Sequence, residues 1–297
     1  MRTIGLCCWL GLLLGLAGMG SAALGADDLR ERARGALHAA LQEETGWTRV
    51  HAAEALLAVG DPEPVRQALA TPDRDESRLP ERIGIWRVRA ALAREPGEKA
   101  LWIKRIEEVA TDSAARDQLQ AVESLAKLDC RPTAAVLVAA RRLAALGDGE
   151  SVFEFWLQHL AGEPGALRQL AGRLDSPVPA ARIRAAYVLR RLRPDDPGVR
   201  CALARAAAAE APTSIAYPYV LGAAWLLDAD PAQMAVWRAA LERIATSGAP
   251  GARYEADQVL MLARLGPTPD FFRAGLEGTG DVRIGAAWAI LTLSDAH

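Results

Sequence analysis

The clearest alternation of apolar and polar positions lies between residues 175 and 203. Three apolar residues recur at intervals of three, which puts them on one face of an α-helix: Ile183, Ala186 and Leu189. After a turn, Asp196 stands at an N-cap position and Pro197 at the first helical position. A second apolar stripe then begins at Val199. The segment predicts a hairpin of two short helices, which needs neighbours because it cannot bury both of its faces alone.

Similar hairpins recur along the chain. Prolines at positions 62, 96, 132, 164, 197, 231 and 267 are spaced 32 to 36 residues apart. Three of them follow an aspartate that we expect to cap a helix: Asp61, Asp196 and Asp230. The sequence Gly-Ala-Ala-Trp occurs at 222–225 and again at 285–288. A period of this length with one hairpin per unit is typical of an α-solenoid. We therefore predict an all-α fold, an α-solenoid of about seven stacked helical hairpins.

The helical pattern begins with an amphipathic helix at 27–43 and ends with a helix at 281–293 that has no partner after it. Seven hairpins are predicted between these two helices. Their apolar stripes lie at 47–70, 86–109, 119–146, 152–160 (the aromatic cluster of the fourth hairpin), 178–209, 215–244 and 254–276. The longest polar connector is 71–80. Small residues suit close helix contacts, and we expect Ala186 and Ala287 to face the interior.

Two segments carry a resemblance to a known family. Arg184-Ala185-Ala186 is followed by Asp196-Pro197-Gly198-Val199, and Asp281-Val282-Arg283 is followed by Ala286-Ala287. In these residues the chain resembles HEAT-like repeats, including the short variety of bilin-lyase-type proteins, over residues 45–293. The resemblance implies a curved stack that binds other macromolecules, with the second helix of each hairpin on the concave face. It also allows an alternative, an enzyme or enzyme accessory subunit of lyase type with a concave-face pocket.

Residues 1–26 differ from the rest of the chain. Arg2 precedes an apolar run from Ile4 to Leu16, and small residues follow at 21–25. This order is typical of a secretory signal peptide, so we predict an exported protein, periplasmic or extracellular, whose domain spans 27–297. The alternative is an uncleaved membrane anchor, because the segment has about the length to span a bilayer. No other segment is apolar for long enough.

The charge balance indicates which partners the chain can bind, and the positions of the cysteines indicate whether they form a disulfide. Lys and Arg number 35 and Asp and Glu 37, whereas a nucleic-acid binder is expected to carry a basic stripe. We therefore predict protein partners, no nucleic acid, and no membrane span once the leader is removed. Cys130 and Cys201 are two repeats apart, too far for a disulfide. We predict two buried or half-buried free thiols.

No motif for a catalytic, cofactor or metal site is found. His51 and Glu54 share a helical face but lack a third ligand, so we interpret His51 as a polar residue of a solvated helix. Paired carboxylates such as Asp195-Asp196 are interpreted as caps, and Asp228-Ala229-Asp230 lacks the rest of a calcium loop.

The tryptophans remain as candidates for binding. Trp102 and Trp237 share apolar stripes with neighbouring residues and are predicted to lie in the core. Trp47 and Trp86 stand near the starts of their helices, so they are the candidate exposed binding aromatics.

Overall fold

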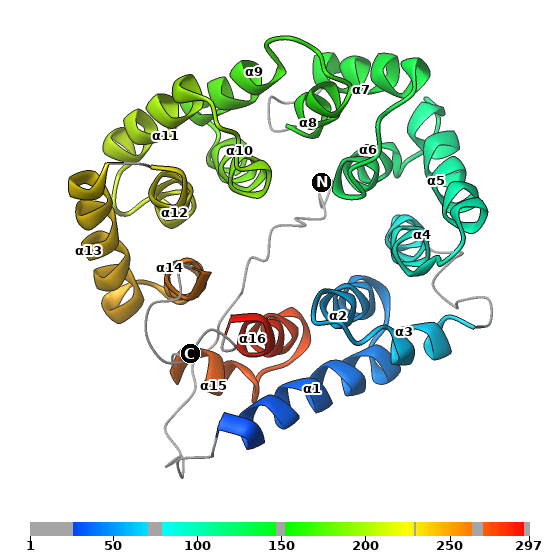
Figure 1. Cartoon of the computed structure of the whole chain (residues 1–297), viewed down its shortest axis with the longest axis horizontal. Helices are drawn as coiled ribbons and strands as arrows, with labels where there is room; N and C mark the ends of the chain where they lie inside the picture. The colour runs from blue at the N-terminus through cyan, green and yellow to red at the C-terminus, as the bar shows by residue number, and fades with distance from the viewer. Residues whose placement is uncertain (1–25, 71–78, 147–151, 229, 263–269, 294–297) are drawn as a thin grey trace. The chain divides into compact units, whose positions relative to one another are not determined.

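The computed structural model describes residues 26–70, 79–146, 152–228, 230–262 and 270–293 (Figure 1). Over these ranges the chain forms sixteen α-helices and one short 3-10 helix, with no strand. The all-α prediction is confirmed. The predicted signal peptide except for Ala26, nearly all of the polar connector, and Pro267 lie outside the described residues. No described helix combines the length and apolar character that crossing a bilayer requires.

The described chain divides into two compact units, and unit 1 draws on both ends of the sequence, residues up to 71 and from 241. Its complete helices are α1 (Ala26–Glu43), α2 (Gly46–Ala58), α3 (Pro62–Ala68), α14 (Pro250–Leu262), α15 (Asp270–Gly275) and α16 (Gly280–Leu293). Helix α16 packs against α1, α2 and α15 (Figure 1). The last helix, expected to have no partner after it, thus packs against the first two.

Unit 2 is one continuous stretch, residues 72–240. It contains α4 (Glu81–Leu92), α5 (Pro96–Thr111), α6 (Gln118–Lys127), α7 (Ala134–Leu146), α8 (Phe153–Leu160), α9 (Ala166–Gly172), the 3-10 helix η1 (Arg173–Asp175), α10 (Pro179–Leu192), α11 (Pro197–Ala209) and α12 (Tyr217–Leu227). Helix α13 (Pro231–Ser247) begins in unit 2 and ends in unit 1. Within unit 2, α4 contacts α5 and α6, α5 contacts α7, and α10 contacts α12. The even-numbered helices α4 to α12 therefore form one row and their odd-numbered neighbours another (Figure 1).

The repeated prolines mark helix starts, as the pattern predicted. Pro62, Pro96, Pro197 and Pro231 are the first residues of α3, α5, α11 and α13. Proline suits this position because the first amide of a helix has no partner within the helix. Pro132 and Pro164 stand just before α7 and α9.

Two of the three aspartates expected to act as caps do so. One carboxylate oxygen of Asp196 accepts hydrogen bonds from the amides of Gly198 (2.7 Å) and Val199 (3.2 Å). Asp230 accepts one from the amide of Ala232 at 2.9 Å. The prediction is wrong for Asp61, which makes no capping bond and lies 2.8 Å from Nε2 of His38. A side chain from α1 has taken the carboxylate that the local sequence assigned to α3.

Small residues stand where helices approach closely. Ala186 and Ala287 are buried, with exposed fractions of 1% and 0%, which confirms that they face the interior. One close approach between two helices involves Gly275 at the end of α15. A Cβ atom built there would lie 2.7 Å from the Cβ of Ala286 in α16, so the contact leaves no room for a side chain.

Candidate functional site

The most distinctive group of side chains lies on the hairpin of α4 and α5. Arg82, Trp86 and Arg89 follow each other on one face of α4, four and three residues apart. Trp102 and Arg105 occupy successive turns of α5. We call these five residues the Trp–Arg ladder. All five belong to unit 2, so two adjacent helices build the group without any contribution from unit 1.

The guanidinium groups of the ladder lie over its indole rings. The Cζ atom of Arg105 lies 4.7 Å from the ring centroid of Trp102 and 5.9 Å from that of Trp86. Arg89 lies 4.9 Å from the ring of Trp102, and Arg82 lies 5.4 Å from the ring of Trp86. All four distances fall within the roughly 6 Å over which a cation is attracted to an aromatic face. Arg105 therefore links the two tryptophans.

The two tryptophan side chains are half-buried, and their polar contacts are made through the ring faces rather than through the indole N–H groups. Both indole N–H groups are covered, and neither meets an acceptor among the described residues. Trp86 is only partly exposed. Trp102 was predicted to lie in the core, but it is also half-buried, and Arg89 and Arg105 lie over its ring. Only the later residues of its predicted stripe, Ile106 and Val109, are buried.

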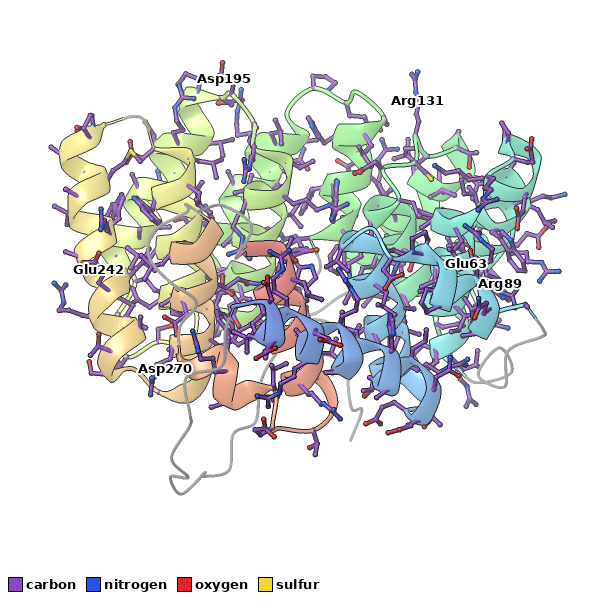
Figure 2. The ribbon with its side chains drawn as sticks, turned by 60° about the horizontal axis from the view of Figure 1, so that its bottom comes forward. Glu63, Arg89, Arg131, Asp195, Glu242 and Asp270 are labelled. Carbon is purple, nitrogen blue, oxygen red and sulfur yellow. The ribbon has the colours of Figure 1, made fainter. Side chains whose placement is uncertain are left out.

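The arginines of the ladder differ in their polar partners. Arg82 donates to both carboxylate oxygens of buried Asp117, at 2.7 and 3.1 Å, which fixes it to the start of α6. Arg89, labelled in Figure 2, also has a polar or electrostatic partner besides the indole. Arg105 is exposed and makes no hydrogen bond or ion pair with any described residue.

This arrangement can bind an anion. Stacking engages the flat face of a guanidinium, whereas its N–H donors point outward in the plane of the group. A stacked arginine can therefore still donate two parallel hydrogen bonds to a carboxylate. Arg105 is exposed and lies over two indole rings, so it is the centre of the candidate site.

The other predicted binding aromatic, Trp47, lies in unit 1 and has a different environment. Its ring stacks on that of His51, with centroids 5.9 Å apart and planes inclined by 27°. His51 Nδ1 lies 2.9 Å from a carboxylate oxygen of Asp281 in the first turn of α16. The side chain of His51 is only 13% exposed, so the expectation of a solvated residue is wrong. Trp47 covers a link between α2 and α16.

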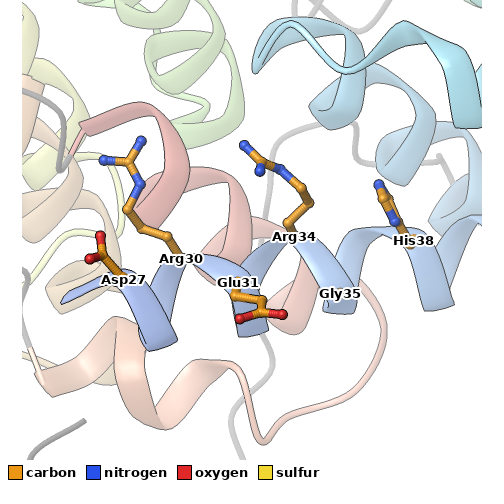
Figure 3. A pocket seen from close by; sticks show the side chains of 6 residues that line it. All are labelled: Asp27, Arg30, Glu31, Arg34, Gly35 and His38. Carbon is orange, nitrogen blue, oxygen red and sulfur yellow. The ribbon is translucent and has the colours of Figure 1, made fainter. Parts of the chain in front are cut away.

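A groove of about 610 Å³ runs along α1 in unit 1 (Figure 3). Its lining comes entirely from one helix: Asp27, Arg30, Glu31, Arg34, Gly35 and His38. Because one helix face cannot enclose a ligand, the groove is an open surface. Arg34 and His38 also point to Asp61, with closest distances of 4.0 and 2.8 Å, so this carboxylate already engages two of the side chains that line the groove.

Both described cysteines are free thiols. Cys130 is half-buried, and burial raises the pKa of its thiol, helped by the charges of Glu107 and Asp129 against that of Lys99. Cys201 is exposed, which contradicts the expectation of a buried or half-buried thiol. Its α11 position points outward because the buried stripe runs through Val199 and Leu203 instead.

A buried acid lies in α14. Asp257 is 6% exposed, and burial raises the pKa of its carboxyl to about 6, although the charge of Arg253 acts in the opposite direction. Among the described residues, no group of three or more His, Cys, Asp or Glu side chains is placed to hold a metal ion.

The sequence indicated only part of this site. It singled out Trp86 but assigned Trp102 to the core, and it gave no role to the arginines. The spacing of Arg82, Trp86 and Arg89, and of Trp102 and Arg105, is a signal that could have revealed a shared face. The pairing across the two helices required the structure. The chain matches no family model, no curated protein and no solved structure.

Proposed function

We propose that the chain is an exported protein-binding scaffold, an α-solenoid of HEAT-like hairpins in which the Trp–Arg ladder is a binding surface. The ladder is the observation that carries this proposal. Tryptophan and arginine are the residue types that contribute most often to the binding energy of protein interfaces. Here they form an ordered group on a partly exposed surface, because each indole is held by at least two guanidinium groups.

The arrangement of unit 2 supports the solenoid part of the proposal. Its helices contact their neighbours in sequence and the next helix but one, which is the pattern of stacked hairpins. In such a stack, side chains on one hairpin, such as α4–α5, can form a binding surface without a central cavity.

Capture of a partner tests the scaffold proposal. The mature chain, immobilised through its C-terminus, is exposed to periplasmic or extracellular extract of the source cells. A protein captured in stoichiometric amounts is then purified and titrated against the chain by calorimetry. A saturable complex supports a scaffold. If no captured protein rebinds after purification, the proposal fails.

Export has an independent test. The order of charge, apolar run and small residues in the leader supports cleavage by a signal peptidase. N-terminal sequencing of the mature protein should begin roughly between residues 22 and 28. An intact Met1 in the soluble fraction would contradict export with cleavage.

A further inference from the structure

We propose that the Trp–Arg ladder binds an acidic segment of a protein partner, with carboxylates of that segment bonded to the guanidinium of Arg105. This inference rests on the proposed scaffold function and adds the chemical class of the partner. Three observations carry it: the polar groups that the ladder leaves available, the apolar surface beside it, and the charge of the hairpin.

The first observation is the state of Arg105. Arg105 is exposed, its guanidinium lies over two indole rings, and it makes no hydrogen bond or ion pair with a described residue. Arg82, in contrast, is already bonded to both oxygens of Asp117. A planar carboxylate matches the in-plane donors of a guanidinium, and the two indoles reduce the side-chain freedom that Arg105 would lose on binding.

The second observation is the apolar surface next to Arg105. Leu101 stands one turn before Arg105 on α5 and is 49% exposed, although it is a large apolar residue. The half-buried ring of Trp102 is its neighbour in sequence. Apolar area beside a cation suits a peptide segment, which can place an apolar side chain next to its carboxylate. A free inorganic anion could not use this area.

The third observation is charge complementarity. The hairpin from Glu81 to Thr111 carries seven basic and five acidic side chains, whereas the whole chain has a net charge of −2. Two of the three lysines of the chain, Lys99 and Lys104, stand on α5, and both are exposed. A local excess of positive charge on an acidic chain favours approach of an acidic partner at this hairpin.

The test uses the full mature chain and two synthetic peptides. The probe is (Glu-Gly-Asp-Leu)3 with blocked ends, and its counterpart replaces every Glu by Gln and every Asp by Asn. Titration by calorimetry at low salt should show binding of the acidic probe and at least tenfold weaker binding of the amide counterpart. Affinity for the acidic probe should fall as salt screens the charges.

Variants locate the binding site. Arg105→Gln should weaken binding of the acidic probe at least tenfold, and Arg105→Lys should weaken it less, because lysine keeps the charge but lacks the fork of donors. Arg142→Gln is the matched control. Arg142 is exposed on α7 and has no aromatic ring against it among the described residues, so its variant should bind within twofold of the wild type. Circular dichroism and melting curves confirm that each variant is folded.

Several outcomes would overturn the inference. These are equal binding of the two peptides, an Arg105→Gln variant that binds like Arg142→Gln, and displacement of the probe by an equal concentration of inorganic phosphate. Binding to phosphatidylglycerol vesicles instead of the peptide would also overturn it. If a captured partner binds Arg105→Gln and wild type equally, the scaffold function stands and the ladder is not its site. If no partner is captured, the scaffold function itself fails.

Discussion

The contact between α15 and α16 gives a sharp test of the packing in unit 1. Gly275→Ala would place a new Cβ atom 2.7 Å from the Cβ of Ala286. Carbon atoms in contact normally stand about 3.5–4.0 Å apart, so the two helices would have to separate by roughly 1 Å. Neither atom can move away alone, because each is fixed directly to a backbone. The contact therefore predicts a loss of stability.

The size of the loss follows from two opposing effects. Overpacking of this kind costs about 1–3 kcal/mol. Replacing a helical glycine by alanine contributes about 0.5–1 kcal/mol in the opposite direction, because the unfolded chain loses freedom. We expect Gly275→Ala to lower the free energy of unfolding by up to about 2.5 kcal/mol. Urea denaturation measures the change, and hydrogen exchange should place it in α15 and α16.

Two further variants isolate the contact. Gly172→Ala in α9 is the matched control, because a Cβ atom at Gly172 meets nothing within 4 Å, and it should be about 0.5–1 kcal/mol more stable than wild type. In the double variant Gly275→Ala/Ala286→Gly the clash is removed, so its stability should exceed the additive expectation by at least about 1 kcal/mol. If Gly275→Ala stabilised the chain as much as Gly172→Ala, the close approach of α15 and α16 would be refuted.

Other features give further predictions. Asp196→Ala removes both capping bonds of α11 and should cost about 1 kcal/mol in urea denaturation; an unchanged midpoint would contradict the cap. With a folded pKa of about 6 and an ordinary value of 3.8, Asp257 keeps its proton in the folded state at pH values where the unfolded chain has released it. Stability should therefore fall as pH rises from about 4 to 6, and Asp257→Asn should remove this fall and be more stable at pH 7, by at most roughly 3 kcal/mol. Parallel pH profiles of the two proteins would argue against the buried acid. Iodoacetamide followed by peptide mass spectrometry should label exposed Cys201 before half-buried Cys130, whose raised pKa lowers its thiolate fraction; the reverse order would contradict these environments. Ala186→Leu should cost about 1–3 kcal/mol and raise hydrogen exchange in α10 and its neighbours, whereas unchanged exchange would place Ala186 at a solvent face.

Local patterns predicted the helices well because their causes are local. The apolar spacing around Ile183 and the proline at the start of α11 act within a few residues, and the structure follows them. The cap of Asp196 is local in the same way. Asp61 has the same Asp-Pro sequence, but His38 from another helix engages it. A rule about neighbours in sequence cannot foresee that competition.

Local sequence patterns could not predict the Trp–Arg ladder or the packing of α16 against α1 and α2 in unit 1. The stripe of Trp102 is apolar at helical spacing, so it indicated a core position. Only the arrangement of α4 against α5 shows that guanidinium groups cover the ring. The apolar sequence of α16 likewise indicates that the helix is buried without showing what covers it. Its packing against α1 and α2 depends on the whole intervening chain.

Because unit 1 is built from both ends of the sequence, its first helices are synthesised long before the last helix that packs against them. His51 and its partner Asp281 are 230 residues apart, and Arg32 and its partner Glu277 are 245 residues apart. At about 5–20 residues per second, a ribosome needs roughly 10–50 s to make such an interval. Unit 2 emerges completely within that time and can form its helix contacts while α1 still waits for α16. A nascent chain that stalls after unit 2 would leave α1 in contact with α2 and α3 but without α16, the helix that it contacts most extensively. Quality control by chaperones and proteases should therefore act first on the amino-terminal helices, although those helices are the first to be made.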